Sequence, residues 1–408
     1  MSPTGSRPDP ILALWASKLS PFALKVEAML VCAGIPYRWM PESGGFFEAH
    51  ALARRLRKVK SGRLPLTWPP MTELDELPLV PFLFAPGGEN LYDSSAIAVW
   101  LDDHRPAPAT HVHPLLPPEP TAERMAIRLI DEALDEIGLY LVHHNRWVVA
   151  ARDNDAGARL AREMRPLLGP LSSALGSTFP ARQVRRLPYL FSVADPADRS
   201  FDDLPRRRRP PSRRDFPPTH ELIEEAFAGL LAALEPVFAS QPFLFGERLT
   251  LADASVYGQL GMNRSDPSAD AWIRRDAPAT AAWLDRIARG EVGHAPSDAE
   301  LSLGESLSPL LDWIYRTFVP LMQQNQDAYE RHRAAGETRF NERAFDAGRA
   351  LYEGELLGRP FRSVVKTFQV RVWRDLRADW EAVGRSERVR LERLLPQAHG
   401  MNVAGYGP

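Results

Sequence analysis

Apolar and polar positions along the first hundred residues alternate between strand-like and helix-like patterns. Residues 11–16 (ILALWA) form a short apolar run after a polar lead, which predicts a buried strand. Residues 22–35 carry apolar side chains at helical spacing up to Gly34, and Ser20 and Pro21 stand where a helix would begin. Residues 37–40 predict a second strand. The chain therefore opens with a strand, a helix and a strand.

The following segments extend this module with a second pair of strands. Residues 46–60 are helical in pattern, and residues 79–84 (LVPFLF) predict a strand that carries Pro81. The sequence PGGE at residues 86–89 is typical of a hairpin turn before a short return strand. A helix then opens at Asp93 and Ser94, with an acidic group at its positively charged end. This order of elements indicates a thioredoxin-like module over residues 10–105.

The remaining chain, after a proline-rich linker at residues 106–120, is almost entirely helical in pattern. Residues 121–147 predict one long amphipathic helix without an internal proline. We assign an all-α domain to residues 119–290 and additional helices to residues 291–395. One segment, residues 192–218, is polar, basic and rich in proline, and it predicts a mobile, disordered-looking surface insertion. Further helices are expected at residues 219–240, 250–261, 278–289, 307–335, 342–357 and 360–395.

Composition excludes several classes of protein. Hydrophobic residues make up 44% and charged residues 25% of the 408 residues, which are ordinary values for a folded chain. No apolar run is long enough for a membrane span, and residues 1–10 lack a signal pattern, so we expect a cytoplasmic protein without a membrane partner. A net charge of −2 argues against nucleic acid as the main partner. The single cysteine, Cys32, excludes a disulfide scaffold.

The turn between the first strand and the first helix is the first candidate for chemistry. Ser17 and Ser20 both stand there. A serine in this position caps the helix by accepting a backbone N–H. The same geometry lets a hydroxyl group donate to an anion such as a thiolate. Cys32 lies late in the helix, away from this turn, and is expected to be a small core residue.

Val80, Pro81, Asp93 and Ser94 form a second candidate. Separately, a proline in a strand marks an edge, and an acidic residue before a helix is a cap. Taken together, a cis proline would expose the backbone of Val80 as a docking edge. Asp93 would meet a ligand ammonium, and Ser94 would meet a carboxylate at the helix start. An amino acid or a peptide carries both groups.

These segments resemble the glutathione-binding module of the glutathione transferase superfamily. The SPF sequence at residues 20–22 is similar to the Ser-Pro-Phe of tau-class and the Cys-Pro-Phe of omega-class enzymes. Residues 80–81 match the family's Val-Pro, and residues 93–94 match its acidic residue followed by serine. Residues 243–260 (FLFGERLTLADASVYGQL) resemble the family's helical-domain signature, in which Thr250 and Asp253 form a capping box. The resemblance covers residues 10–105 and 120–290, and it implies an all-α glutathione transferase domain after the thioredoxin-like module.

The resemblance also implies an activity. Ser20 would activate the thiol of glutathione, the co-substrate, for attack on a hydrophobic electrophile by conjugation, displacement or ether cleavage. Ser17 is the alternative for this role. A homodimer is expected, because members of the family commonly pair. The residues that would bind glutathione are Val80, Pro81, Asp93 and Ser94, and the candidates for the electrophile pocket are Ser17, Phe22, Tyr140, His144 and Trp147.

Departures from the family pattern leave a second hypothesis open. The segment between Ile35 and Val80 is longer than in the family, so Lys58, Lys60, Arg63 and Trp68 are all candidates for the glycine end of glutathione. Residues 291–408 extend past the usual end of the fold, and some relatives of this kind have lost catalysis. The protein could therefore be a non-catalytic binding or scaffold protein that uses its C-terminal helices as a partner surface.

Two further clusters are assigned no function. The acidic and histidine side chains of residues 121–147 do not assemble a ligand set, so no metal is expected. The basic run at residues 206–214 has no interleaved aromatic side chains, and it is expected to be a solvated loop rather than a nucleic-acid site.

Overall fold

The first module is a four-stranded mixed sheet with helices on both faces. The computed structural model describes residues 11–67, 80–104, 113–197, 201–292, 296 and 299–394. The strands lie in the order β2–β1–β3–β4. Strand β1 (Leu12–Trp15) is parallel to β2 (Tyr37–Met40) and antiparallel to β3 (Phe82–Phe84), which is antiparallel to β4 (Asn90–Tyr92). The predicted thioredoxin-like arrangement is confirmed.

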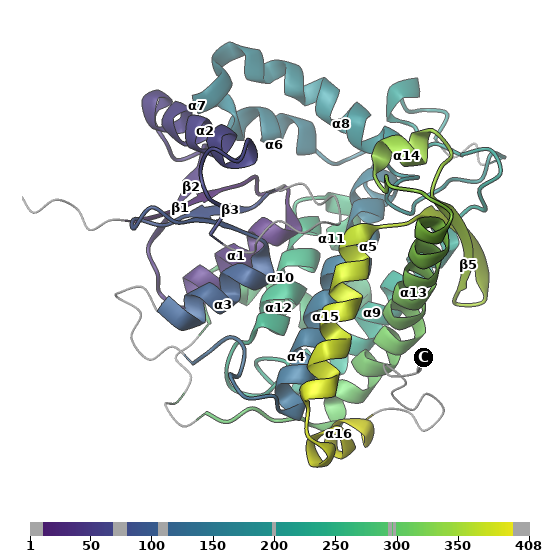
Figure 1. The fold of residues 1–408 in the computed structure, drawn as a ribbon. Helices are drawn as coiled ribbons and strands as arrows, with labels where there is room; N and C mark the ends of the chain where they lie inside the picture. Colours follow the sequence, from purple (N-terminus) through teal and green to yellow (C-terminus); the bar gives the residue numbers. More distant parts are fainter. Residues whose placement is uncertain are drawn as a thin grey trace, which may run out of the picture.

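The two faces of this sheet follow from the alternation of side chains along β1. Leu12 and Leu14 join the core that includes helices α1 (Pro21–Cys32) and α3 (Ser94–His104). Trp15 points to the opposite face, where it packs with side chains of α2 (Phe46–Lys60). Figure 1 shows α2 on one side of the sheet and α1 and α3 on the other.

A continuous helical rod follows the linker, as predicted, but it is not a regular α-helix. It consists of α4 (Ala122–Ala133), the π-helix η1 (Leu134–Gly138), α5 (Leu139–His144) and the π-helix η2 (Asn145–Val149). The rod is amphipathic at its start and buried along most of its length. Segments of π-helix inside α-helices are often found at functional sites, and η1 contains Asp135 and Glu136.

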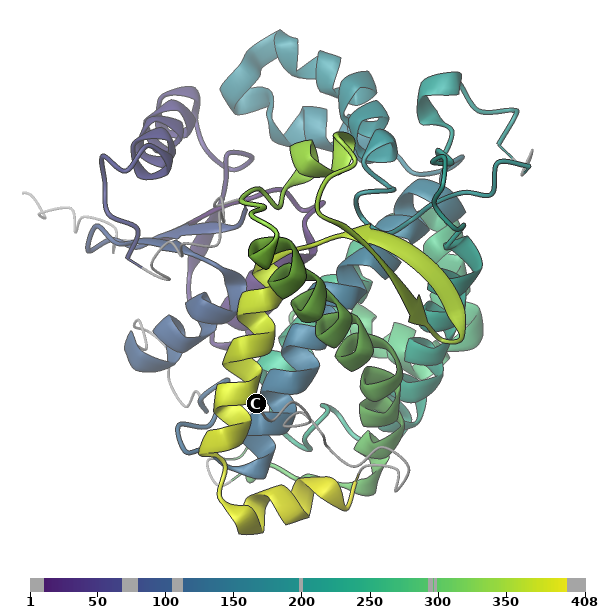
Figure 2. The same ribbon diagram turned by 45° about the vertical axis from the view of Figure 1, so that its right-hand side comes forward.

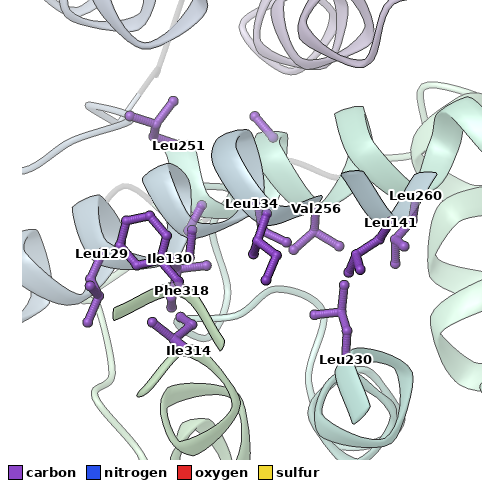
Figure 3. Close-up of a cluster of buried hydrophobic side chains, with 14 of the residues drawn as sticks. Leu129, Ile130, Leu134, Leu141, Leu230, Leu251, Val256, Leu260, Ile314 and Phe318 are labelled. Atoms are coloured by element: carbon purple, nitrogen blue, oxygen red, sulfur yellow. The ribbon is translucent and has the colours of Figure 1, made fainter. Parts of the chain in front are cut away.

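The rod packs in a bundle whose centre is α10 (Leu251–Asn263). This helix is buried on nearly all sides and starts with the capping box of Thr250 and Asp253 that the sequence predicted. Figure 3 shows side chains of α10 and of the rod meeting Leu230 of α9 (His220–Ser240) and Phe318 of α13 (Ser308–Ala334). The remaining helices of this region are α11 (Pro267–Asp276), α12 (Pro278–Ala288) and the 3₁₀ turn η5 (Glu305–Leu307).

Residues 151–197 and 201–218 form a lobe beside the sheet. Its helices are α6 (Ala156–Glu163), α7 (Arg165–Leu168), η3 (Gly169–Ala174), α8 (Leu175–Arg185) and η4 (Arg206–Arg208). The prediction of a mobile insertion at residues 192–218 is wrong for the part that the structure describes. Apolar side chains scattered through this mainly polar segment are buried and anchor it to the protein, among them Val193, Phe201, Leu204 and Phe216. The Arg213 guanidinium lies over the Phe345 ring, so the basic run is also partly packed.

The C-terminal extension corrects the prediction of two long helices at residues 342–357 and 360–395. Only α14 (Glu342–Asp346) is helical at the start, and it is followed by a hairpin of β5 (Leu351–Leu356) and β6 (Arg359–Val364). Two helices, α15 (Thr367–Ala382) and α16 (Arg385–Glu392), follow the hairpin. Both contact α4, and Figures 1 and 2 show α15 lying alongside it.

None of the helices in the described ranges combines the length and the apolar character that crossing a membrane requires.

Candidate functional site

Strands β1, β3 and β4 are antiparallel neighbours, and the chain enters or leaves all three at the same edge of the sheet. Trp15, the last residue of β1, is opposite Phe82, the first residue of β3, and Phe82 is opposite Tyr92, the last residue of β4. The chain after β1, the chain before β3 and the chain after β4 therefore leave the sheet at the same edge. Whatever side chains these segments carry are brought close together.

These three segments are the ones that the sequence singled out. The first contains Ser20, the second contains Val80 and Pro81, and the third contains Asp93 and Ser94. The peptide bond between Val80 and Pro81 is cis, as the hypothesis required. Pro81 is buried and Val80 is partly exposed. The fold thus groups the predicted site residues at one end of the sheet.

The two serines of the turn differ in what their hydroxyl groups contact. Ser17 Oγ donates to Glu163 Oε2 of α6 at 2.5 Å and accepts from the backbone N–H of Leu19 at 3.2 Å. Ser20 has extended backbone angles and precedes Pro21, but its side chain makes no capping hydrogen bond to α1. The Ser17 hydroxyl is therefore engaged by Glu163, whereas the half-buried Ser20 side chain does not cap α1.

Asp93 serves as the cap of α3 and is held in a left-handed backbone conformation, with φ of 75°. Its Oδ1 accepts hydrogen bonds from the backbone N–H groups of Ser95 at 3.0 Å and Ala96 at 3.1 Å. This arrangement satisfies two of the free N–H groups at the helix start. Ser94, the first residue of α3, is only 5% exposed.

The other carboxylate oxygen of Asp93 faces a residue that the sequence analysis missed. Arg371 of α15 places its Nη2 atom 3.4 Å from Asp93 Oδ2. The two residues are 278 positions apart in the chain, and no motif surrounds Arg371. The C-terminal extension therefore reaches the candidate site directly.

A buried charge cluster under this site was also missed. Lys25 of α1 is 1% exposed, and its Nζ lies 2.5 Å from Asp131 Oδ1 and 2.6 Å from Asp135 Oδ2. It also donates to Ser95 Oγ at 2.8 Å, one residue beyond Ser94. Burial works to lower the pKa of Lys25, but attraction by Asp131 and Asp135 outweighs it and raises the pKa. The lysine is therefore charged and joins α1, α3 and the rod.

Two acidic side chains of the rod near this cluster, Asp135 and Glu136, have raised pKa values. Burial raises the pKa of Glu136 to about 8, and the nearby carboxylate of Glu132 adds to the effect. Burial also raises the pKa of Asp135, although Lys25 opposes it. The rod thus presents carboxyl groups of unusually high pKa behind the sheet edge. Perturbed pKa values of this kind are frequent near functional sites and also occur in structural networks.

Three residues predicted for the electrophile pocket are enclosed in the protein. Tyr140 is 5% exposed and stacks on Phe191, while its hydroxyl accepts a hydrogen bond from Gln369 Nε2 at 2.9 Å. His144 is fully buried between the Ser192 hydroxyl and Glu224. The structure differs from the prediction because the extension and the lobe of residues 151–218 cover this part of the rod.

Trp147 is enclosed in the same way. Its ring packs against Leu19 and Phe179 and is 2% exposed. Phe22, in contrast, is partly exposed in the first turn of α1, next to Ser20. Of the predicted pocket residues, Ser17 and Phe22 are therefore the two that the structure leaves partly exposed beside Ser20.

Cys32 and two of the residues considered for the glycine end of glutathione, Lys60 and Trp68, complete the set of candidates from the sequence. Burial raises the pKa of the Cys32 thiol, and Cys32 packs against the main core, as expected of a structural cysteine. Lys60 lies over the ring of Phe82, and Trp68 lies outside the described residues. Within the described ranges, no three His, Cys, Asp or Glu side chains come together in a group that could hold a metal ion.

Two family models match the chain. Residues 19–104 match the N-terminal domain of glutathione S-transferases, and residues 217–286 match their C-terminal domain. A thioredoxin-like sheet followed by a helical bundle defines the class of fold that these models describe. The chain belongs to the glutathione transferase superfamily. Residues 105–216, which include most of the lobe, and all residues after 286 lie outside both models.

Solved structures similar to the chain are remote. A glutathione S-transferase from Methylobacterium radiotolerans, in complex with glutathione sulfonate, is 20% identical, with 71% of this chain and 97% of that chain covered and a TM-score of 0.35. One from Ceriporiopsis subvermispora, in complex with glutathione, is 17% identical, with 71% and 100% covered and a TM-score of 0.41. The beta-etherase LigF of Sphingobium is 19% identical, with 68% and 94% covered and a TM-score of 0.37. No curated protein matches the sequence.

Proposed function

We propose that the protein is a glutathione transferase that binds reduced glutathione at the shared edge of β1, β3 and β4 and attacks a hydrophobic electrophile. The observation that carries this proposal is the convergence of Ser20, the Val80–Pro81 segment and the Asp93 helix start at that edge. This convergence lies within a domain that matches glutathione transferases.

The roles of the residues follow from their chemistry. The backbone of Val80 offers an N–H and a C=O to the cysteinyl backbone of glutathione, as in strand addition. The Asp93 carboxylate attracts the ammonium of the γ-glutamyl group, and the N-terminus of α3 at Ser94 favours its carboxylate. The glutathione thiol is thereby directed towards the turn that holds Ser20.

Ser20 acts on the sulfur. Its hydroxyl donates a hydrogen bond to the thiolate, which lowers the pKa of the thiol, and the thiol proton passes to water. The thiolate then forms a bond to an electrophilic carbon. In an addition the substrate takes up a proton. In a displacement or an ether cleavage the leaving group departs with the electron pair of the broken bond.

A specific observation favours a second candidate, a non-catalytic binding or scaffold protein of the same fold. Tyr140, His144 and Trp147 are enclosed, and Asp93 already faces Arg371. Under this alternative the extension would be a partner surface and the glutathione site would stay closed.

Calorimetric titration with glutathione distinguishes the transferase from the non-catalytic scaffold protein. Asp93→Asn is the sharpest variant, because asparagine still caps a helix and tolerates a positive φ, and only the charge is removed. We expect the native protein to bind and this variant to bind about 10–100-fold more weakly, the effect of losing a hydrogen bond to a charged group. Asp93→Ala removes both cap and charge and should bind more weakly still. No binding by the native protein at millimolar glutathione would favour the scaffold.

Catalysis is tested on Ser20 with Ser17 as the matched control. The ultraviolet absorbance of the bound thiolate, titrated against pH, should show a higher thiol pKa in Ser20→Ala than in the native protein. Conjugation to a chlorinated dinitrobenzene should fall in parallel. Ser17→Ala should leave both unchanged, because Ser17 is engaged by Glu163. The opposite pattern would assign the role to Ser17.

The homodimer and the cytoplasmic location belong to the same proposal. The extension covers one face of α4 with α15 and α16, so a dimer would have to use another surface. Light scattering on the purified protein tests the stoichiometry.

A further inference from the structure

Helix α15 is the unexpected neighbour of the candidate glutathione site. It belongs to neither matched domain, yet its Arg371 lies 3.4 Å from Asp93, the residue proposed to bind the ligand ammonium. The Arg371 side chain is 21% exposed and that of Asp93 is 13% exposed. The pair is therefore at the boundary between the protein and solvent, where a ligand can reach it.

Arg371 is held in place from several directions. Its Nη1 atom lies 3.2 Å from Asp375 one turn later in α15, and its guanidinium lies over the ring of Phe368. The start of α15 is fixed by Asn325 of α13, whose side chain both donates to and accepts from the backbone of Lys366 at 2.9 Å. A side chain fixed in this way loses little conformational freedom when it binds a ligand.

The contact between Arg371 and Asp93 is loose. A separation of 3.4 Å is longer than the 2.7–2.9 Å usual for a charge-assisted hydrogen bond. The Oδ1 atom of Asp93 is already used by the helix cap, so only Oδ2 faces Arg371. The pair lacks the short contacts of a structural salt bridge, such as the 2.7 Å pair of Arg146 and Asp266.

A separated pair of opposite charges matches the head group of an α-amino acid. Such a group carries an ammonium and a carboxylate on one carbon, so it can exchange one loose ion pair for two contacts of opposite sign. The planar fork of arginine suits a carboxylate better than any other side chain does. The ammonium would then take the place of Arg371 beside Asp93, and the carboxylate would meet Arg371.

We propose that Arg371, together with the N-terminus of α3, binds the α-carboxylate of the γ-glutamyl group of glutathione and acts as a specificity-determining residue of this site. The inference rests on the proposed function and deepens it. The C-terminal extension completes the binding site from within the same chain, and it selects a ligand that has a free α-carboxylate next to its ammonium.

The test compares two ligands on four proteins. The ligands are glutathione and the analogue 4-aminobutanoyl-cysteinylglycine, which lacks only the α-carboxylate. The proteins are the native chain, Arg371→Ala, Arg371→Lys and the control Arg374→Ala, an exposed arginine of the same helix. Calorimetry gives the affinities, and circular dichroism with thermal unfolding shows that each variant is folded.

We expect the native protein to prefer glutathione over the analogue by about 10–100-fold, as for a hydrogen bond between charged groups. Arg371→Ala should lose most of this preference by weakening glutathione alone. Arg371→Lys should keep a part of it because the charge remains, and Arg374→Ala should keep all of it.

Other outcomes overturn the inference. If Arg371→Ala binds glutathione as tightly as the native protein, Arg371 does not bind the carboxylate. If the variant binds more tightly, Arg371 only competes with the ligand ammonium for Asp93. An equal loss of both ligands would show a structural role. If the native protein binds neither ligand, the proposed function itself fails. In the two preceding outcomes the native protein still binds glutathione, so only the role of Arg371 is refuted.

Discussion

Replacing Lys25 by methionine should reveal how much the fold depends on the buried charge cluster beneath the candidate site. The change keeps a long side chain but removes the cation that lies 2.5 Å from Asp131 and 2.6 Å from Asp135. Both carboxylates would remain buried, with Arg128, 3.8 Å from Asp131, as the other nearby cation. Breaking a buried pair in this way costs about 3–5 kcal/mol. We expect a loss of this size near neutral pH.

The loss should also depend on pH in a defined direction. Burial raises the pKa of Asp135 to about 7 in the folded protein, far above that of an exposed aspartate. The folded protein therefore favours the neutral form of Asp135. Asp135 contributes most to the free energy of unfolding below the pKa that it has in the unfolded chain, and this contribution is lost as the pH rises through its pKa in the folded protein. Without Lys25 the pKa of Asp135 in the folded protein rises further. At pH values above this raised pKa, each additional pKa unit lowers the free energy of unfolding by about 1.4 kcal/mol. The loss in Lys25→Met should therefore be larger at about pH 8 than at about pH 5.

Urea unfolding followed by tryptophan fluorescence at both pH values measures these effects. Lys18→Met is the control, because its ion pair with Glu42 is 43% and 39% exposed and should be worth at most about 1 kcal/mol. The double variant Lys25→Met with Asp135→Asn should recover part of the stability, since it also removes one stranded charge. A loss below about 1 kcal/mol in Lys25→Met, or one that is equal at the two pH values, would refute the reasoning.

Two further predictions concern helix α10. In Gly258→Ala the new Cβ would lie 2.5 Å from the Pro21 carbonyl oxygen, so α1 must move. We expect the free energy of unfolding to fall by roughly 1–3 kcal/mol, which thermal unfolding measures. Gly261→Ala, whose nearest neighbour would be at 3.5 Å, should be neutral or stabilising, and a fall as large as in Gly258→Ala would contradict the steric explanation. Thr250→Ala removes one half of the capping box and should cost about 0.5–2 kcal/mol in urea unfolding, whereas Thr250→Ser should retain most of it. Equal losses in the two Thr250 variants would show that the methyl group, not the hydroxyl, matters.

The first module could be predicted from the sequence because its signals are local. The apolar run of β1, the turn at residues 86–89 and the cap at Asp93 each depend on a few neighbouring residues. Strand register then brings Ser20 and Asp93 to one edge without further information. For the same reason the capping box of Thr250 was recognisable before its partners were known.

The hairpin at residues 351–364 was missed because its residues favour a helix locally. Glu353, Glu355 and Leu356 are good helix formers. The decisive signals were the turn at Leu357 and Gly358, which both have positive φ, and close packing against Phe361, which leaves no room for a side chain at residue 354. Tertiary packing overrode local propensity here.

Arg371 could not have been found from sequence patterns. An arginine among the many arginines of this chain carries no distinguishing signal, and its partner lies in another domain. The burial of Tyr140 and His144 was equally unpredictable, because the elements that cover them come from the lobe and the extension. Contacts between distant segments are set by the assembled fold.

The contacts of α15 also determine where the chain can be cut. A gene fragment ending near residue 290 would contain both matched domains and would look sufficient by homology alone. Such a fragment would nevertheless lose the hydrogen bond between Gln369 and Tyr140 and the ion pair between Arg371 and Asp93. It would also expose the face of α4 on which α15 and α16 pack. The smallest unit that keeps these contacts therefore includes the extension, and a fragment cut at the family boundary would expose apolar surface that the full chain buries.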